Sequence, residues 1–296
     1  NGLTYDRHGE IGAIEVFAEN IMEAGNEFLD KSMDPPFMPS WQRVVSAVPD
    51  IFEMLSEAVE ADADEFGANT TSRALKQSES KRLRQRIRLH MAEIYGAGDA
   101  DALTERLLVE AGLKGYKLSI PAVENKWDER DAVLITYGDS ILGKDQAPLQ
   151  SLYDFLMKRA AQTFSGVHIL PFFPFSSDDG FSISDYEAVN PELGNWADIE
   201  KIGTNFKLMS DLVLNHCSSQ HDWFKNYLQG KSPGTGYFIE PDSGDDLSQV
   251  VRPRSSPLLT KVETVQGERS VWCTFGPDQV DLDFSNPEVL FEIVKI

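Results

Sequence analysis

Residues 208–216 read LMSDLVLNH, and this stretch decides the fold. Its apolar run, rich in Leu and Val, ends in Asp211, Asn215 and His216 and then gives way to polar residues. A strand buried on both faces lacks polar alternation and presents functional side chains at its exit, so the pattern predicts a core strand with a polar end. Asp211 within the run needs a cationic or hydrogen-bonding partner, because a buried carboxylate is costly without one.

The sequence before this stretch alternates between strand and helix patterns. Compact apolar runs at 132–137 and 166–171 predict two more buried strands. Residues 196–202 fit a helix, and so do residues 149–161, whose expected inward side chains are Leu149, Leu152, Phe155, Leu156 and Ala160. Strand, helix, strand, helix, strand without a glycine-rich phosphate loop favours the start of a (β/α)8 barrel over a dinucleotide-binding sheet.

The first 130 residues show helical patterns and no spacing that indicates chemistry. Residues 1–66 are acidic, and residues 67–79 are rich in Gly, Asn, Thr and Ser, which is typical of a linker. Helices are expected over 80–95 and 100–112, the second capped by Asp99 or Asp101. The basic stretch KRLRQRIR at 81–88 has its apolar residues at helical spacing, so we interpret it as a solvated helix face.

Composition excludes several classes of partner and compartment. The formal net charge of −21 disfavours nucleic acid and anionic membranes as partners. Cys217 and Cys273 form neither a disulfide framework nor a CxxC pair, which suits a reducing cytoplasm. No apolar run approaches the roughly 20 residues of a membrane span, and no signal peptide is present. The sequence starts at Asn1 and stops at Ile296 within an apolar helical pattern, so we expect a piece of a longer chain.

Two loops carry the candidate functional residues. Residues 171–186, after the second predicted strand, read PFFPFSSDDGFSISDY. Aromatic side chains among adjacent carboxylates suit a sugar, because they offer a flat apolar platform and acceptors for vicinal hydroxyls; an ordinary turn with Asp caps is the alternative. In a barrel of this type the carboxyl ends of the strands form the functional face, so Asn215 and His216 should share a rim with Asp178.

Several blocks resemble a known family. DLVLNH (211–216) resembles the first signature motif of the α-amylase superfamily, glycoside hydrolase family 13, and QVDLD (279–283) resembles the motif that closes its inserted B domain. VLITYGDS, GVHILPFFPFSSDDGFSISDY and VRPRSSPLLT are similar to the sucrose phosphorylase branch. The lead-in from RIRLHMAEIYG to NKWDERDAVLITYGDS resembles the glucosylglycerate phosphorylases. The resemblance covers about residues 80–296, whereas residues 1–66 resemble the tail of glucosyl-phosphoglycerate synthase-type glycosyltransferases.

The resemblance implies an α/β fold, an incomplete (β/α)8 TIM barrel with its first three strands, an inserted B domain after strand three and an N-terminal helical extension. The expected segments are a helical acidic segment at 1–66, linker and helical lead-in at 67–130, three β/α units at 131–216, the B domain at 217–284 and the start of the next barrel helix at 285–296.

The resemblance also implies a role for each matched residue. Asp178 would accept hydrogen bonds from a glucosyl unit, Phe181 would lie beneath its ring, and His216 would bind the same sugar. Phe275 and Gln279 would line the site, and Arg254 would contribute to phosphate binding, while Arg252 is structural. Asp211 would be held by an arginine further along the chain. The remaining residues implied to be structural are Asn215, Tyr186, Asp281 and Asp283.

The implied reaction is phosphorolysis of an α-glucoside with retention, which yields α-glucose 1-phosphate without a metal or a cofactor. The nucleophilic Asp and the acid/base Glu of the family belong to later barrel strands and are absent here, so the chain alone is expected to be inactive. A sucrose or sucrose-phosphate phosphorylase remains open as an alternative, and so does a non-catalytic remnant. The expected partners are an α-glucoside and inorganic phosphate, not nucleic acid or membrane.

Overall fold

The computed structural model describes residues 51, 70–113, 131–241, 244, 247–252 and 254–296. The chain divides into two compact units, Asn1–Glu129 with Leu290–Lys295 and Arg130–Val289 with Ile296. The helical segment expected at 1–66 lies outside the described residues except for Ile51, which is helical and buried.

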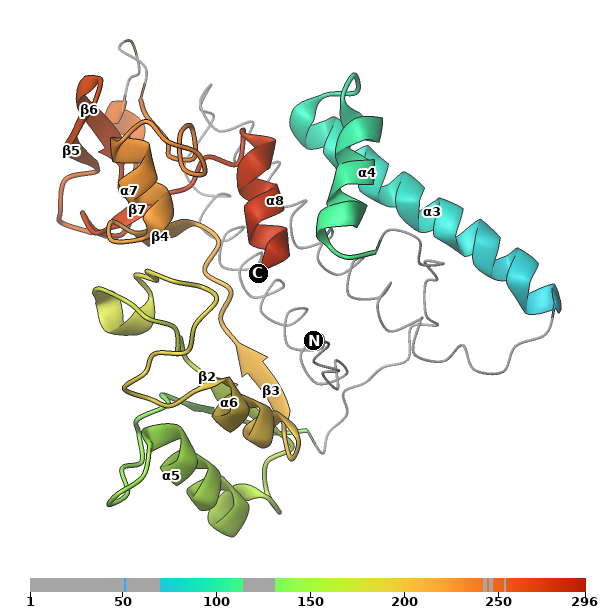
Figure 1. The fold of residues 1–296 in the computed structure, drawn as a ribbon, viewed down its shortest axis with the longest axis vertical. Coiled ribbons are helices and arrows are strands. Elements are labelled where there is room, and N and C mark those ends of the chain that lie inside the picture. The colour runs from blue at the N-terminus through green and yellow to red at the C-terminus, as the bar shows by residue number, and fades with distance from the viewer. Residues whose placement is uncertain (1–50, 52–69, 114–130, 242–243, 245–246, 253) are drawn as a thin grey trace. The chain divides into compact units, whose positions relative to one another are not determined.

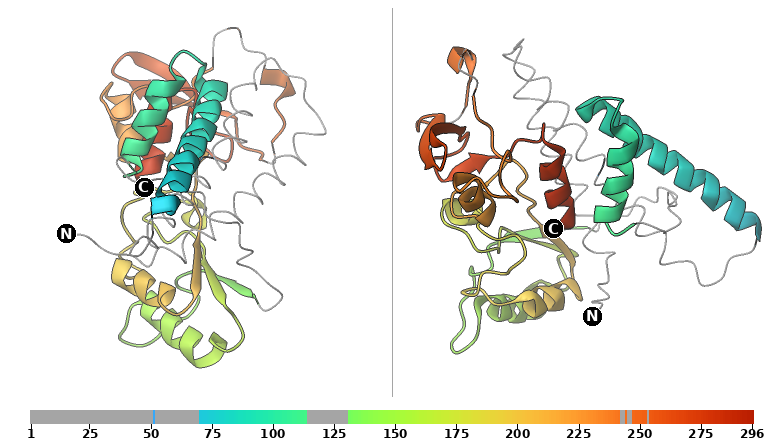
Figure 2. Two further views of the ribbon diagram at one scale, coloured as in Figure 1. Left: turned by 90° about the vertical axis from the view of Figure 1, so that its right-hand side faces the viewer. Right: turned by 45° about the horizontal axis from the view of Figure 1, so that its top comes forward.

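The second unit begins with a three-stranded parallel sheet. Strands β1 (Val133–Thr136), β2 (Gly166–Ile169) and β3 (Lys207–Ser210) pair in that order. Helices α5 (Pro148–Phe155) and α6 (Trp196–Gly203) connect the strands and lie on the same face of the sheet (Figures 1 and 2). All four residues of the central strand β2 are buried, as expected for a strand covered on both sides. The predicted order of strands and helices is confirmed.

The third predicted strand is wrong in its extent. The strand expected over 208–216 ends at Ser210, and Asp211 therefore lies just beyond it. The neighbouring strand β2 ends at Ile169 and is followed two residues later by Pro171, which has no N–H to continue a ladder. His216 instead begins a separate strand, β4 (His216–Ser218), which pairs antiparallel with β7 (Gln279–Asp281).

The helix expected over 149–161 has the predicted extent, but its last turn is a π-helix over Leu156–Ala160. Leu149, Leu152, Leu156 and Ala160 are buried, as predicted. Phe155 is 38% exposed, so its inward placement is wrong. Phe155 follows Leu149 by six residues, or about 240° around a helix, and this rotation carries it off the buried face.

Helix α6 is fixed by local hydrogen bonds. The side chain of Asn195 accepts from Ala197 N at 2.9 Å, and Asp198 Oδ2 accepts from Asn195 N at 3.0 Å, which completes a capping box. The other oxygen of Asp198 accepts from Gln150 Nε2 at 3.0 Å and ties α6 to α5. This pair of helices holds the sheet from which the loops of the site emerge.

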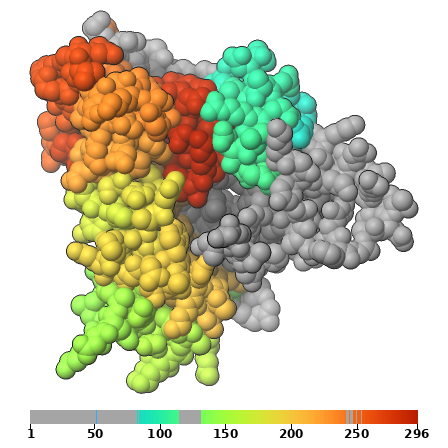
Figure 3. All heavy atoms as spheres, in the orientation of Figure 1, coloured from blue at the N-terminus to red at the C-terminus, as the bar shows by residue number. Residues whose placement is uncertain are grey.

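The rest of the second unit follows β4. Helix α7 (Asp222–Leu228) precedes a hairpin of β5 (Leu259–Thr264) and β6 (Gly267–Trp272), and β7 then returns to β4. Buried aromatic side chains of α7 (Trp223, Phe224 and Tyr227) pack against Tyr237 and Phe238. In the space-filling view the yellow residues that follow β2 lie between the green sheet region and the orange residues of this segment (Figure 3).

The first unit contains helices α3 (Thr70–Tyr95) and α4 (Ala100–Glu110). Helix α3 begins ten residues before the predicted helix, so the linker expected over 67–79 is wrong from Thr70 onward. Residues 74–77 (ALKQ) are all strong helix formers, and their propensity outweighs the polar residues around them. Asp99 occupies the N-cap position of α4 as predicted, but the described residues show no capping bond from its side chain.

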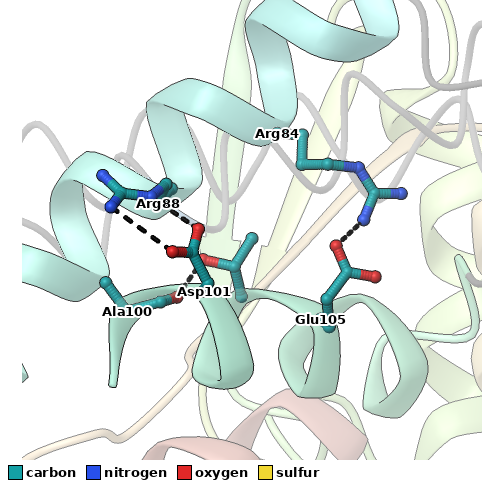
Figure 4. Close-up of polar contacts among 6 residues, drawn as sticks. Arg84, Arg88, Ala100, Asp101 and Glu105 are labelled. Atoms are coloured by element: carbon teal, nitrogen blue, oxygen red, sulfur yellow. Dashed lines mark hydrogen bonds and ion pairs between the residues drawn. The ribbon is translucent and has the colours of Figure 1, made fainter. Parts of the chain in front are cut away.

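Two arginines of the basic stretch pair with α4 (Figure 4). Arg88 donates to Asp101 through Nε at 2.6 Å, and Arg84 pairs with Glu105. The apolar positions Ile87 and Met91 are fully buried, as the helical spacing predicts. The basic face is therefore partly paired instead of only solvated, although exposed pairs of this kind contribute only about 0–1 kcal/mol each.

Helix α8 (Pro287–Lys295) confirms the helix expected at 285–296. Its side chains Val289, Leu290, Phe291 and Ile293 are buried. Among the helices that the structure describes, none combines the length and apolarity needed to cross a bilayer.

Candidate functional site

Gln279 on β7 brings two predicted site residues together. Its amide Nε2 donates to Asp178 Oδ2 at 2.8 Å and lies 3.1 Å from His216 Nε2. The β4–β7 register, which pairs Ser218 with Gln279 and His216 with Asp281, places these side chains beside each other. Asp178 follows β2 and His216 begins β4, so the loops after two neighbouring strands meet at one point, as the sequence predicts.

Asp178 lies in a strained turn. Asp178, Asp179 and Gly180 all have left-handed φ angles, of 56°, 51° and 109°. Asp tolerates this region better than most residues, but each such residue still costs about 1 kcal/mol or more. A Cβ on Gly180 would lie 2.8 Å from the carbonyl oxygen of Pro171, so this position accepts only glycine. Strain of this kind, held by its surroundings, is common at functional sites.

His216 is a buried, neutral base. It is only 4% exposed, and burial lowers its pKa to about 4 although its hydrogen bond with Phe181 and the charge of Asp178 raise it. Its Nε2 lies 3.0 Å from the Phe181 carbonyl oxygen, which requires a donor, and also faces the amide nitrogen of Gln279, which requires an acceptor. A single Nε2 cannot satisfy both at once. Its Nδ1 is buried with no partner in the part of the chain that the structure describes.

Arg254 and Phe275 extend the cluster. The Phe275 ring centroid lies 5.0 Å from that of His216, and the Arg254 guanidinium lies 5.7 Å from the Phe275 centroid. The three side chains form a row of contacts in which the Phe275 ring is the shared neighbour of the guanidinium and the imidazole. Arg252 donates instead to the Thr274 carbonyl oxygen at 2.9 Å, a contact that supports the backbone. An arginine in such a row can offer several fixed donors to an anion.

Asp211 has a partner that sequence reasoning missed. His168 Nε2 lies 2.8 Å from Asp211 Oδ2, and both residues are buried. An arginine further along the chain is the expected partner; within the described residues the side chain that contacts the Asp211 carboxylate is His168. His168 stands on β2 opposite Met209 of β3, so the sheet register brings it near the end of β3. The sequence could have indicated this partner, because His168 lies on the strand predicted to neighbour the one that leads to Asp211.

Tyr186 and Asn215 hold the backbone of the site. The Tyr186 hydroxyl lies 3.0 Å from the carbonyl oxygens of both Val213 and His216, and burial raises its pKa well above the ordinary value. The Asn215 carbonyl oxygen accepts from Leu282 N at 2.9 Å, which extends the pairing of β4 and β7. Phe181 presents its carbonyl oxygen to His216.

Tyr137 and Asp278 are further residues of the site that sequence reasoning missed. Tyr137 follows β1, and its pKa is raised by burial and then by the charges of nearby carboxylates, namely Asp179, Asp178, Asp211 and Asp139. Its position directly after β1, at the carboxyl end of a strand, could have identified Tyr137 as a site residue from the sequence. Asp278 accepts hydrogen bonds from serines on two loops, and no local pattern in the sequence pairs it with them.

Within the described residues no group of three His, Cys, Asp or Glu side chains is arranged to hold a metal ion. His221 uses Nδ1 to accept from Trp223 N at 3.1 Å and so caps α7. Asp281 accepts from Thr274 N at 3.0 Å, and Asp283 accepts from Ser285 N at 2.9 Å, so both support local backbone.

Buried groups at this site predict loss of stability in acid. Burial lowers the pKa of His216 and of His221 to about 4, so between pH 6.5 and 4 the unfolded chain binds two protons that the folded chain does not. Burial raises the pKa of Asp281 to about 7, so in the same window the folded chain holds one proton more than the unfolded chain. The net difference is one proton, and the free energy of unfolding should fall by about 1.4 kcal/mol per unit of acidification.

Urea unfolding followed by tryptophan fluorescence between pH 6.5 and 4.5 measures this slope. The His221→Asn variant keeps a capping side chain but removes one histidine, so its slope should approach zero. Stability that rises on acidification would contradict the assigned protonation states.

Comparison with known proteins identifies the family. The family model "Alpha amylase, catalytic domain" matches residues 160–296. Glucosylglycerate phosphorylases of Allomeiothermus silvanus and Spirochaeta thermophila are 50% and 46% identical to the chain over 72% and 71% of its length. The chain spans 38% and 37% of the length of these two relatives.

The structure of sucrose 6F-phosphate phosphorylase from Thermoanaerobacter thermosaccharolyticum has a TM-score of 0.50 and 34% identity, covering 57% of this chain and 37% of that one. This likeness and the parallel β1–β2–β3 sheet indicate a partial barrel of the TIM type. The family expected from the sequence motifs is confirmed by these matches: residues 160–296 match the catalytic domain of the α-amylase superfamily, glycoside hydrolase family 13, and the chain resembles its glucosylglycerate and sucrose phosphorylases.

Proposed function

We propose that this chain supplies the substrate-positioning part of a retaining α-glucoside phosphorylase that acts on glucosylglycerate or a close analogue. The nucleophilic Asp and the acid/base Glu come from later barrel strands, so residues 1–296 alone do not turn over. Residues 217–284 correspond to the inserted B domain of the family. Cys217 and Cys273 are free, buried thiols, in keeping with a cytoplasmic protein, and the partners are an α-glucoside and inorganic phosphate.

One observation supports the proposal above all others. The amide of Gln279 contacts the Asp178 carboxylate at 2.8 Å and the His216 imidazole at 3.1 Å. Together these groups offer an acceptor for vicinal hydroxyls, a neutral imidazole and an amide, all at the carboxyl-terminal side of the sheet. The Phe275 ring lies beside the His216 imidazole, with 5.0 Å between the ring centroids, and adds an apolar surface. This combination suits one sugar ring better than a metal ion or a phosphate.

The proposed reaction has two steps, each with inversion at the anomeric carbon. A carboxylate attacks C1 while the bond from C1 to the glycosidic oxygen breaks, and a carboxylic acid gives its proton to the departing oxygen. A phosphate oxygen then attacks C1 and releases the carboxylate, which yields α-glucose 1-phosphate. Asp178 and His216 act on the glucosyl hydroxyls, where hydrogen bonds strengthen as the ring flattens toward the oxocarbenium-like transition state.

We propose glycerate as the acceptor, and an assay of candidate glucosides tests this choice. Identities of 50% and 46% to glucosylglycerate phosphorylases favour glycerate, compared with 37% to a sucrose 6(F)-phosphate phosphorylase. The second candidate is therefore phosphorolysis of sucrose or a sucrose phosphate, supported by the structural likeness to the enzyme acting on the latter.

The test uses the complete enzyme, meaning this chain joined to the later barrel strands of the family. With inorganic phosphate it should release α-glucose 1-phosphate faster from glucosylglycerate than from sucrose or sucrose 6-phosphate. The 296-residue chain alone should release none. Faster release from a sucrose would support the second candidate, turnover by the chain alone would refute the assignment of the catalytic carboxylates, and no release by the complete enzyme would indicate a remnant.

Arg254→Ala in the complete enzyme should raise the KM for phosphate by about 10–100-fold, because a hydrogen bond to a charged group contributes about 1.5–3 kcal/mol. The KM for the glucoside should change little, since the side chains that contact Gln279 around the proposed glucosyl site are Asp178 and His216, and Arg254 contacts Phe275. Initial rates at varied phosphate and glucoside measure both constants.

Lys261→Ala is the matched control for Arg254→Ala. Lys261 is an exposed cation on β5 that pairs with Glu268 at 2.7 Å, and its removal should leave both constants unchanged. A larger effect of Arg254→Ala on the glucoside than on phosphate would mean that Arg254 faces the sugar.

A further inference from the structure

Asp278, directly before β7, accepts hydrogen bonds from serines in two parts of the chain. Its Oδ2 accepts from Ser176 at 2.5 Å, Ser177 at 2.6 Å and Ser182 at 3.0 Å, and its Oδ1 accepts from Ser219. Ser182 Oγ lies equally close to the backbone oxygen of Asp278, at 3.0 Å, so its one hydrogen is shared between the two acceptors. The backbone oxygen also accepts from Ser219 N at 2.9 Å. The carboxylate thus joins the loop after β2 to the residue that follows β4.

These contacts enclose the strained turn of the site. Ser176 and Ser177 precede Asp178, and Ser182 follows Phe181, so Asp278 holds the chain on both sides of the left-handed residues. Backbone bonds also cross this turn: Ser176 N to Ser182 O at 3.0 Å, Ser182 N to Ser177 O at 3.3 Å, Phe181 N to Asp178 O at 3.0 Å and Ser184 N to Pro174 O at 2.8 Å. The Asp278 contacts add side-chain bonds that tie the same turn to β7. A turn that carries three left-handed residues needs support from its surroundings, and Asp278 supplies it.

The next residue of the chain completes the arrangement. Gln279 contacts the carboxylate of Asp178 itself. Two consecutive residues therefore hold the turn: Asp278 binds the serines on either side of it, and Gln279 binds the Asp178 side chain within it.

We call Asp278 with Ser176, Ser177, Ser182 and Ser219 the Asp278 clamp. This clamp requires a carboxylate. Each serine hydroxyl has one hydrogen to donate, and two carboxylate oxygens can accept all four, whereas an amide offers one oxygen and points two hydrogens at the remaining hydroxyls. Burial raises the pKa of Asp278, but the serine hydrogen bonds outweigh it and the pKa is lowered, so the group is charged.

We propose that Asp278 is a positioning residue for the glucosyl site, which fixes Asp178 and Phe181 in place through Ser176, Ser177 and Ser182. The inference rests on the proposed function for its catalytic consequence, and the clamp itself can be tested without activity. Asp278 does not touch the substrate. It acts through the geometry of the turn, and phosphate binding at Arg254 does not depend on it.

The first arm of the test needs no turnover. Hydrogen exchange of the Asp278→Asn chain should show amides in the peptide 174–186 exchanging about 10-fold faster or more, while a peptide of α5 is unchanged. Ser177→Ala, which removes one donor of four and should fold without difficulty, should give a smaller increase in the same peptide. Unchanged exchange of 174–186 in both variants would overturn the clamp.

The second arm uses the complete enzyme. Asp278→Asn should lower kcat/KM for the glucoside by about 10-fold or more and leave the KM for phosphate within about twofold, a division that loss of folded protein cannot produce. Asp185→Asn is the control, since Asp185 is an exposed carboxylate of the same loop and accepts a local hydrogen bond from Glu187 N at 2.8 Å. Faster exchange with unchanged glucoside kinetics would overturn the positioning role. An inactive wild-type enzyme would count against the proposed function and leave the exchange result to decide the clamp.

Discussion

Replacing His216 by alanine should lower kcat of the complete enzyme by about 100-fold or more and change the KM for phosphate by less than about threefold. The imidazole is neutral and buried beside Gln279 and the Phe181 carbonyl, so the hydrogen bond to the sugar that we propose for it would form at a buried group. A bond of this kind strengthens as charge develops on the ring and therefore stabilises the transition state more than the bound glucoside. Steady-state rates with glucosylglycerate at varied phosphate measure both constants.

His221→Asn provides the matched control for His216→Ala. Both histidines are buried and share a pKa lowered to about 4, but His221 caps α7 and lies away from Asp178. The control should retain kcat within about twofold, because asparagine is also a good capping residue. An effect of His216→Ala confined to the KM for phosphate would mean that the imidazole faces the anion and not the sugar.

Gly180→Ala should reduce kcat/KM for the glucoside by about 100-fold or more. The added Cβ would lie 2.8 Å from the Pro171 carbonyl oxygen, and the φ of 109° is strained for any L side chain. Pro171 closely follows β2 and cannot withdraw without disturbing the sheet, so the turn must move and carry Asp178 away from Gln279. Misplacement of about 1 Å suffices for a loss of this size.

Gly203→Ala is the comparison for the glycine substitution. Gly203 is the last residue of α6, and a Cβ added there would lie 3.8–3.9 Å from Leu208, which is ordinary van der Waals contact. Alanine at this position should leave activity unchanged and stability equal or slightly higher. Thermal unfolding and glucoside kinetics of the two variants separate a local effect on the turn from a general effect of adding a methyl group. Full activity of Gly180→Ala would show that the turn geometry is not required.

Sequence reasoning could predict the site where side chains follow a strand or a signature motif. Asp178, His216 and Gln279 belong to three separate blocks, and the structure brings them within hydrogen-bonding distance of one another through the amide. The rule that strand exits converge in a parallel sheet was sufficient for Asp178 and His216, whereas Gln279 was predicted only by the family resemblance. It could also have found Tyr137, which lies at the exit of β1.

The remainder depends on contacts that no local pattern encodes. The third strand was predicted too long because apolar residues 212–214 match a strand pattern. The pairing of β3 with β2 ends at Ser210, opposite Ile169, the last residue of β2. The serines of the Asp278 clamp are about 60 to 100 residues from their acceptor, and serine in a loop ordinarily indicates only a turn. His168 as partner of Asp211 follows from strand register, which the sequence of either strand alone does not reveal.

The β4–β7 ladder has a consequence for how the family can diversify. Only three residue pairs, from His216–Asp281 to Ser218–Gln279, align the two strands, and a shift of one residue would turn His216 and Gln279 to opposite sides. The intervening chain of 60 residues, from 219 to 278, can lengthen at little entropic cost because closure entropy grows slowly with length. Natural insertions and deletions should therefore accumulate in the β5–β6 hairpin, which allows the acceptor preference to evolve without loss of glucosyl recognition.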